Sequence, residues 1–591
     1  MNRLGALVTA VLHGQKRTNP MTIRVHTKTT TQGDMIAVKP GPSTAGPTPT
    51  DKQVMCTVQD AVPVSIDPSD RANALHVASL GVISVMGGQY YGWNAALSTG
   101  FVPYVVSQIV MGMTYVIYMS CAAEICGKIA FSGGSYGLAR VTLGFYVGYL
   151  VGCMELLEYA ASSSVSVNFL GEFITGKLNL DVRYEPVVWL VYFVLVNGFF
   201  KLRGQLMWNL LVVFALLCVL PAVLFIAGTI PFANLAQYGY VLNNETDPPT
   251  HIWASGNLAT AYFAWLPYTT WAYAGVESLS LVTDMTGEPK KAIPRGMLGA
   301  VWTLFVLNVS MVCLVPSLPP GIVSATSATY PLNAGFALAY GKSDTLGAWL
   351  IVPAQVGMAA GFVLPSARLL QALADSTLLP QWLGLKQTVS ANGGGSWRAL
   401  TLSSLFSFLL CVCSYASPAF SSALQNTFLL AGCFSYIAQM IGFILLRTTY
   451  KAESHGYKSP FGVPGAVFAC TVYCLLGLSI VGGFQGDNGT AALAGLAYVT
   501  LLTGYYFYAC KDRQTISKDE YASIFRFTII KFNNLKRKAA RRAKHKAKPS
   551  LWKRFAAKVR PSTSTSKPST KIGYTDVGVG HPKLPRPASQ K

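Results

Sequence analysis

The sequence predicts an all-α integral membrane protein with about twelve transmembrane helices. Hydrophobic residues make up 51% of the 591 residues, and charged residues only 12%. Long apolar runs recur between residues 75 and 510, and two of them are interrupted by glycines near their middle. Because about 20 apolar residues in a helix cross a bilayer, most of these runs are long enough to be spans. The composition argues against a soluble protein.

Hydropathy places the expected spans one after another along the chain. We expect them at residues 75–97, 101–124, 138–171, 187–200, 206–229, 258–283, 298–318, 346–373, 399–415, 422–447, 464–484 and 491–510. Residues 71–510 are therefore the predicted twelve-helix domain. Residues 1–70 are predicted to be a disordered cytoplasmic tail, because they lack periodicity and are rich in Thr, Pro and Gly. Residues 511–591 are predicted to be a basic cytoplasmic tail.

The loops between the spans predict the orientation. Lys and Arg gather in the loops after even-numbered spans, whereas the opposite loops hold only Lys177, Arg183 and Lys342. Because positive charge marks the cytoplasmic side, both termini are predicted to be cytoplasmic, with the plasma membrane as the expected location. Two glycosylation acceptor sequences, at Asn244 and Asn488, fall in loops of the opposite side.

The first span is predicted to break in its middle. It contains Met86-Gly-Gly-Gln-Tyr-Tyr-Gly-Trp93, and Gly87, Gly88 and Gly92 remove helix propensity at mid-membrane. The alternative is that Gly88 and Gly92 only allow close helix packing.

The sixth span carries Trp271-Ala-Tyr-Ala-Gly-Val-Glu277 at its centre. A carboxylate is costly against lipid and normally faces a bundle interior or a wet cavity, so Glu277 is a candidate functional residue. The alternative is a structural Glu277 that backbone or hydroxyl groups satisfy. Interrupted spans at corresponding positions of two halves indicate a transporter site, and they predict spans 1–5 and 6–10 as inverted repeats.

The third span contains two further acids. Glu155 and Glu158 are three residues apart and so share one helix face. One of them would attract a substrate ammonium or carry a coupling proton, or the two form a hydrogen-bonded packing pair.

These strings resemble motifs of the amino acid-polyamine-organocation permeases. The sixth span followed by Gly287-Glu-Pro-Lys-Lys-Ala-Ile-Pro-Arg295 resembles that family's sixth helix and the loop after it. Three further strings resemble family motifs, namely Ala123-Glu124, Ser132-Gly-Gly-Ser-Tyr-Gly-Leu-Ala-Arg140 and Leu446-Arg447 with Lys458-Ser-Pro-Phe-Gly-Val-Pro464. The resemblance covers roughly residues 70–510, and it implies a five-plus-five inverted-repeat (LeuT-like) core with discontinuous helices 1 and 6.

Two branches of that family are most similar. Gln89-Tyr-Tyr-Gly-Trp-Asn94 and the third-span acids resemble ethanolamine-permease-type members, although the position of Gln89 is commonly acidic there. The sixth span is similar to the arginine-agmatine antiporters. In those proteins the residue matching Trp271 closes over substrate, and the residue matching Glu277 is implicated in gating.

We therefore expect a secondary transporter that moves an amino acid or a related small amine, ethanolamine included, by alternating access. The expected coupling ion is a proton or sodium. Half-helix ends suit a substrate carboxylate or ammonium, and aromatic side chains can hold an ammonium. The expected substrate-binding residues are Gly87, Gly88, Gln89, Tyr90, Trp271, Ala272, Tyr273, Gly275 and Glu277. Glu155 and Glu158 are expected to bind the substrate or a coupling proton.

Two other functions use the same scaffold, a nutrient-sensing receptor and an inorganic-ion cotransporter. An enzyme is not expected, because the seven histidines and other polar residues form no nucleophile and base set. The twelve cysteines have no metal-ligand spacing, so neither a metal nor a cofactor is expected.

Basic residues are concentrated at the C-terminal end. From Lys511 onward the chain holds 22 of its 46 Lys and Arg residues, against four acids. The run Lys536–Lys548, with Trp552 and Phe555 beyond it, is predicted to contact anionic lipids. The alternative is a solvated tail that only fixes topology. Nucleic acid is not an expected partner, because no folded domain combines aromatic and basic residues.

Overall fold

The structure is a computed structural model of the chain. It describes residues 57–59, 68–90, 92–128, 133–202, 204–243, 250–341, 344–380, 383, 397–450, 456–486 and 488–547. Most of the predicted tail of residues 1–70, as well as Asn244, Trp552 and Phe555, lies outside these residues. Residues 1–531 form one unit, and residues 532–591 form a second unit of which the structure describes 532–547, the end of helix α19.

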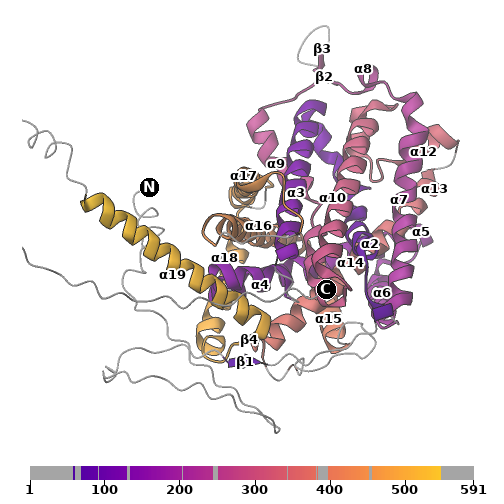
Figure 1. Cartoon of the computed structure of the whole chain (residues 1–591). Coiled ribbons are helices and arrows are strands. Elements are labelled where there is room, and N and C mark those ends of the chain that lie inside the picture. Colours follow the sequence, from indigo (N-terminus) through magenta and orange to yellow (C-terminus); the bar gives the residue numbers. More distant parts are fainter. Residues whose placement is uncertain are drawn as a thin grey trace, which may run out of the picture. The chain divides into compact units, whose positions relative to one another are not determined.

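Twelve successive apolar segments of the described residues are helical, which confirms the predicted fold class (Figure 1). They are α2 (Ala74–Met86), α3 (Phe101–Lys128), α5 (Phe145–Leu178), α6 (Glu185–Phe199), α7 (Gly204–Thr229), α9 (Leu258–Thr270) with the 3-10 helix η6 (Val276–Met285), α10 (Pro289–Leu314), α14 (Val352–Asp375), α15 (Trp397–Ala416), α16 (Pro418–Thr448), α17 (Gly462–Val481) and α18 (Thr490–Tyr505). Eight helices of the described part are long and apolar enough to cross a membrane.

Short elements connect these segments. The helices are α4 (Gly134–Leu143), α8 (Leu235–Tyr238), α11 (Ile322–Ser327), α12 (Asn333–Tyr340) and α13 (Asp344–Leu350), and α19 (Lys518–Ala547) follows the last span. Strand β1 (Thr57–Gln59) pairs in parallel with β4 (Thr515–Ser517), and β2 (Val241–Asn243) pairs antiparallel with β3 (Thr250–Ile252).

Local sequence explains where several helices begin. The Asn73 side chain accepts a hydrogen bond from the His76 N–H at 3.0 Å and caps α2, and Asn257 caps α9 in the same way. Ser417 caps α16, where Pro418 occupies the first helical position.

Two predicted boundaries of the spans are wrong. The third span was expected from residue 138, but Gly144, at φ 106°, ends α4 and separates it from α5. This left-handed conformation favours glycine and stops the helix. The seventh span was expected from residue 298, but α10 begins at Pro289, because proline is well suited to the first turn of a helix.

Both predicted breaks are confirmed. Helix α2 gives way after Met86 to the 3-10 helix η2 (Gly87–Gln89), and Gly92 has a φ of 86°. Helix α9 ends at Thr270, and a non-helical turn leads to Gly275, at φ 112°, before η6 begins. Helices 1 and 6 of the bundle are therefore discontinuous.

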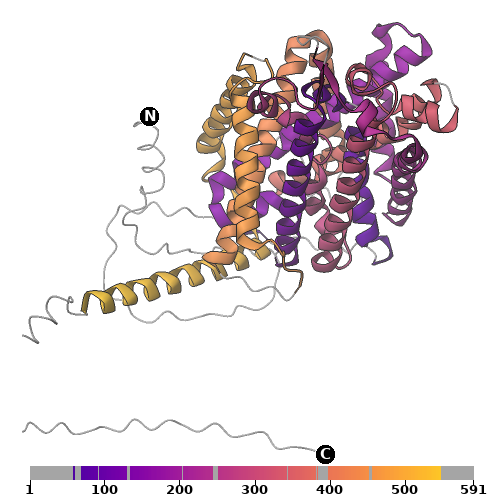
Figure 2. The ribbon, with the colours of Figure 1, turned by 90° about the horizontal axis from the view of Figure 1, so that it is seen from above.

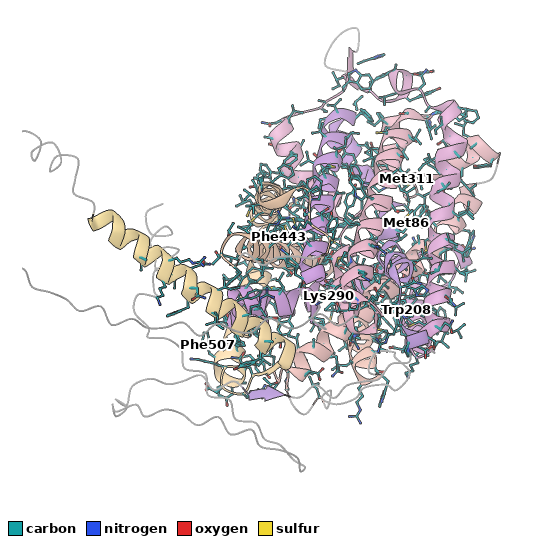
Figure 3. All side chains as sticks on the ribbon, in the orientation of Figure 1. Met86, Trp208, Lys290, Met311, Phe443 and Phe507 are labelled. Carbon is teal, nitrogen blue, oxygen red and sulfur yellow. The ribbon has the colours of Figure 1, made fainter. Side chains whose placement is uncertain are left out.

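The core lies where the broken helices meet their neighbours. Helix α10 packs against α2 and α3, and α14 packs against α5 and α2. Helices α3 and α10 lie side by side in both ribbon views (Figure 1 and Figure 2). Met86, Met311 and Phe443, labelled in Figure 3, are fully buried in this core.

Candidate transport site

The two helix breaks touch each other. A Cβ added to Gly88 would lie 2.1 Å from the carbonyl oxygen of Trp271, and one added to Gly92 would lie 3.0 Å from the Trp271 ring. Only glycine permits so close an approach at position 88. The two alternatives from the sequence thus coexist, because these glycines accompany an unwound helix and also allow close packing.

Gln89 connects the breaks through its side chain. Its Nε2 atom donates to the carbonyl oxygen of Ala272 at 3.3 Å and to that of Leu304 at 3.0 Å. The Gln89 Oε1 atom and the Trp271 Nε1 atom are buried and have no protein partner among the described residues. Most buried polar atoms in proteins are hydrogen-bonded, so an unpaired acceptor and donor mark this junction as a candidate binding site.

Tyr90 points to α7. Its hydroxyl donates to the carbonyl oxygen of Cys218 at 2.6 Å and accepts from the Ala222 N–H at 3.0 Å. Those two groups are four residues apart and would otherwise pair within the helix. Since α7 also contains Pro221, the Tyr90 hydroxyl is inserted at a perturbed turn.

Tyr273 is fixed to α3 and α10. Its hydroxyl accepts from Asn308 Nδ2 at 2.8 Å, and its ring stacks on Tyr115 with centroids 5.5 Å apart. Asn308 also donates to Gln108 Oε1 at 2.9 Å. Because these partners are buried, the Tyr273 side chain helps to position the turn between Trp271 and Gly275.

Glu277 closes that turn. Its carboxylate oxygens accept from the Gly275 N–H at 2.9 and 3.1 Å, and the residue is 3% exposed. It also lines a small cavity of about 20 Å³, which has room for about one water molecule. The other lining residues are Ala122, Ile125, Cys126, Gly134, Ser135, Leu138, Ser280, Thr283, Met297 and Gln439.

Glu155 faces neutral donors. It accepts hydrogen bonds from Ser135 on α4, from Ser435 Oγ at 2.5 Å and from Gln439 Nε2 at 3.0 Å. It is fully buried, as is Ser435. Glu155 therefore joins α4, α5 and α16 without a cationic partner among the described residues.

Glu158 lies beside a cluster of four tyrosines that the sequence analysis missed. Tyr436 donates to Glu158 Oε1, while Oε2 has no partner among the described atoms. The rings of Tyr115, Tyr118, Tyr436 and Tyr473 have centroids 5.0–6.2 Å apart. The i, i+3 spacing of Tyr115 and Tyr118 was the available signal, but their partners come from α16 and α17.

Glu155, Glu158 and Glu277 have no basic partner in the part of the chain that the structure describes. The same part of the chain holds no His, Cys, Asp and Glu group suited to a metal ion. An acidic interior of this kind can take up a proton or the cationic group of a ligand.

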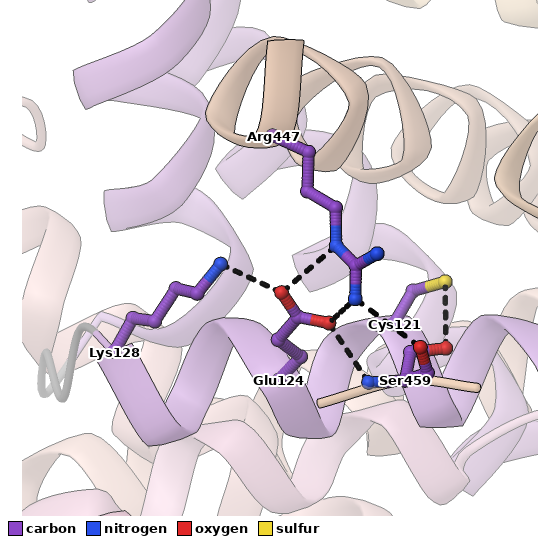
Figure 4. Close-up of polar contacts among 5 residues, drawn as sticks. All are labelled: Cys121, Glu124, Lys128, Arg447 and Ser459. Carbon is purple, nitrogen blue, oxygen red and sulfur yellow. Dashed lines mark hydrogen bonds and ion pairs between the residues drawn. The ribbon is translucent and has the colours of Figure 1, made fainter. Parts of the chain in front are cut away.

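A second polar centre joins two strings that resembled family motifs. The Glu124 carboxylate accepts hydrogen bonds from Lys128 Nζ at 2.6 Å and from the Ser459 N–H at 2.8 Å (Figure 4). It also accepts two from Arg447, one from Nε at 3.0 Å and one from Nη2. The Ser459 hydroxyl lies 3.7 Å from the Cys121 sulfur. This centre ties the end of α3 to α16 and to the segment before α17.

Comparisons with known proteins agree with this architecture. The family described as "Amino acid permease" matches residues 76–518. An uncharacterized transporter of Rhizobium meliloti is 24% identical over 39% of this chain, and the match spans about half (49%) of that relative. The branched-chain amino acid permease BcaP of Lactococcus lactis is 22% identical over 62% of this chain and 80% of its own length.

A solved structure is also similar. The crystal structure of the Eremococcus coleocola manganese transporter has a TM-score of 0.49 and 13% sequence identity, over 77% of this chain and 95% of that chain.

The family match covers three quarters of the sequence, from the first span to the segment after the last. The chain therefore belongs to the amino acid permease family and is a multi-pass membrane transporter of small molecules, not an enzyme.

Proposed function

We propose that the protein is a secondary active transporter of amino acids or related small amines, with the substrate bound where the two helix breaks meet. The observation that carries this proposal is a pair of buried atoms at the junction, Gln89 Oε1 and Trp271 Nε1, that have no hydrogen-bond partner among the described residues. The predicted site residues Gly87, Gly88, Ala272 and Gly275 supply backbone around them. The relative BcaP is named for branched-chain amino acids, which supports an amino acid as the substrate.

The coupling ion in this proposal is a proton. Glu155, Glu158 and Glu277 are buried with neutral donors around them, so charging all three together would be costly. Taking up one proton relieves the repulsion between carboxylates, and this supports coupling of substrate to a proton.

Orientation and membrane contacts are part of the proposal. Both termini are cytoplasmic in a plasma-membrane protein, with Asn244 and Asn488 as outward-facing glycosylation sites. On α19, Phe525 and Ile529 are exposed and lie four residues apart, on one helix face. Together with the basic residues that follow, this apolar face supports contact with anionic lipids.

The test is uptake into liposomes containing the purified protein. A labelled panel comprises ethanolamine, polyamines, and cationic, neutral and acidic amino acids, each with and without a proton or sodium gradient. We expect one class to accumulate under a proton gradient, and Trp271→Ala and Glu277→Gln to reduce uptake. The exposed Trp302 and Glu288 provide matched controls, Trp302→Ala and Glu288→Gln, that should leave uptake unchanged.

Other outcomes assign the protein differently. Binding without flux under every gradient would favour a nutrient sensor with this fold. No binding of any organic amine would favour an inorganic-ion cotransporter. Accumulation of substrate under a sodium gradient alone would make sodium the coupling ion instead of the proton. If uptake by the Glu277→Gln variant kept its full dependence on the proton gradient, Glu277 would have no role in coupling.

A further inference from the structure

The chain after α18 returns to the helix bundle and binds to the end of α14. Residues 513–520 will be called the strap. The Thr515 N–H donates to the carbonyl oxygen of Ser376 at 3.1 Å, and Thr515 Oγ1 donates to that of Asp375 at 2.9 Å. Thr377 Oγ1 in turn donates to the carbonyl oxygen of Arg513 at 2.5 Å. These bonds hold the strap on the side of the bundle that carries α4 (Figure 1).

The strap also covers a buried arginine of α4. Arg140 is 2% exposed, and its Nη2 atom donates to the carbonyl oxygen of Thr515. Its Nη1 atom donates to Tyr136 and Ser376, and a carboxylate oxygen of Glu520 lies 3.6 Å away. A buried guanidinium requires acceptors and a counter-charge, and the strap supplies one of each.

Helix α4 connects the strap to the candidate site. Ser135 donates to Glu155, five residues before Arg140 on the same short helix. Gly134, Ser135 and Leu138 also form one wall of the small cavity that Glu277 lines. A shift of α4 would therefore change both the hydrogen bonding of Glu155 and the width of this cavity.

We propose that the strap is a regulatory element that holds α4 closed against Glu155 and Glu277, and that its release opens the cavity to the cytoplasm. Without the Thr515 carbonyl and Glu520, Arg140 loses an acceptor and a counter-charge, so the strap no longer holds α4 in place against Glu155 and Glu277. This regulatory role rests on the proposed function, because that function makes Glu277, which lines the cavity, a candidate for carrying the coupling proton.

The test uses Cys126, which lines the same cavity, as a probe in the full-length protein. The rate at which a small maleimide alkylates Cys126 is followed by peptide mass spectrometry, with Cys433 as an internal reference. Cys433 is 2% exposed and lies outside the residues that line the cavity. We expect Glu520→Arg to raise the alkylation rate of Cys126 several-fold and to leave that of Cys433 unchanged.

A matched control replaces another acidic residue, close to the strap, with Arg. Asp512 is exposed and precedes the strap, so Asp512→Arg should not alter either rate. Thr377→Val removes one strap bond without changing charge and should give an intermediate increase at Cys126. The role of the strap would be disproved by equal Cys126 rates in wild type, Glu520→Arg and Thr377→Val, or by a parallel rise at Cys433, which reports general loosening.

The alkylation readout is independent of substrate. If no amine is transported but Glu520→Arg still opens the cavity, the proposed function fails and the strap remains a conformational element. If uptake is confirmed while the Cys126 rate does not respond, transport stands and the strap proposal fails.

Discussion

Arg447 on α16 donates hydrogen bonds to both carboxylate oxygens of Glu124 on α3. The two residues are 323 positions apart in the sequence. Glu124 is 1% exposed, and it also accepts hydrogen bonds from the Lys128 ammonium and the Ser459 N–H. A planar guanidinium matches a carboxylate in this two-bond arrangement, which a lysine cannot reproduce.

Replacing Glu124 with Gln should destabilise the protein. The change removes the negative charge that two basic side chains share and replaces one of the two acceptor oxygens with an NH2 donor. Breaking a buried ion pair costs about 3 kcal/mol. We expect a clear decrease in the thermal unfolding midpoint of the purified protein in detergent. Arg447→Lys should lower the midpoint by a smaller amount, because it keeps the charge and loses the two-bond geometry.

Glu288→Gln is the control for that experiment. Glu288 pairs with Lys291 at 2.8 Å, but both side chains are 70% exposed. Hydrogen bonding by Lys291 lowers the pKa of Glu288. An exposed pair stabilises little, so the midpoint should not change. Equal effects of Glu124→Gln and Glu288→Gln would contradict the structural importance of the Glu124 centre.

Gly88→Ala should impair both folding and transport. Its Cβ would lie 2.1 Å from the Trp271 carbonyl oxygen, so the two breaks would have to separate. Such overpacking costs roughly 1–3 kcal/mol. Unfolding in detergent and uptake into liposomes measure the two effects. Gly504→Ala, within α18 and with nothing within 4 Å of the added Cβ, should be neutral or slightly stabilising.

Gln89→Glu tests the link between the breaks. The amide donates to the carbonyl oxygens of Ala272 and Leu304, whereas a carboxylate faces both oxygens without a proton to donate. We expect Gln89→Glu to lower the unfolding midpoint more than Gln89→Met, because each lost partner costs about 1–3 kcal/mol and Glu adds a buried charge. A Glu variant as stable as wild type would contradict this role of the Gln89 amide.

Tyr90→Phe tests the hydroxyl inserted in α7. Its loss leaves the Cys218 carbonyl and the Ala222 N–H without their bridge, at a cost of about 1 kcal/mol or more. We expect a small decrease in the unfolding midpoint, whereas Tyr508→Phe, at a residue that is 93% exposed, should cause none. If the midpoint of Tyr90→Phe rises instead, pairing of Cys218 with Ala222 is the better arrangement.

The helix breaks could be predicted because glycine and a carboxylate inside apolar runs are local signals. The i, i+3 spacing likewise predicted a shared face for Glu155 and Glu158. Their partners could not be predicted, because Ser435 and Tyr436 lie about 280 residues further along the chain. No local pattern in the third span specifies which face of α16 will meet it.

Side-chain directions at the breaks were also beyond the sequence. An unwound segment has no periodicity, so the sequence could not predict that the Tyr90 hydroxyl bridges two backbone groups of α7. Its role as a site residue stays a prediction. Arg140 belongs to the string Ser132–Arg140, which resembles a family motif. Its contact with Thr515, however, links residues 375 positions apart. That contact depends on the course of the chain after the last span.

The long-range Glu124 centre has a consequence for biosynthesis. At about 5–20 residues per second, the ribosome needs roughly 16 to 65 s to add the 323 residues between Glu124 and Arg447. During that time the Glu124 carboxylate has Lys128 but lacks its principal partner. The second helix of the bundle thus acquires its ionic anchor only when the tenth has been inserted, which makes the ion pair a marker of late assembly.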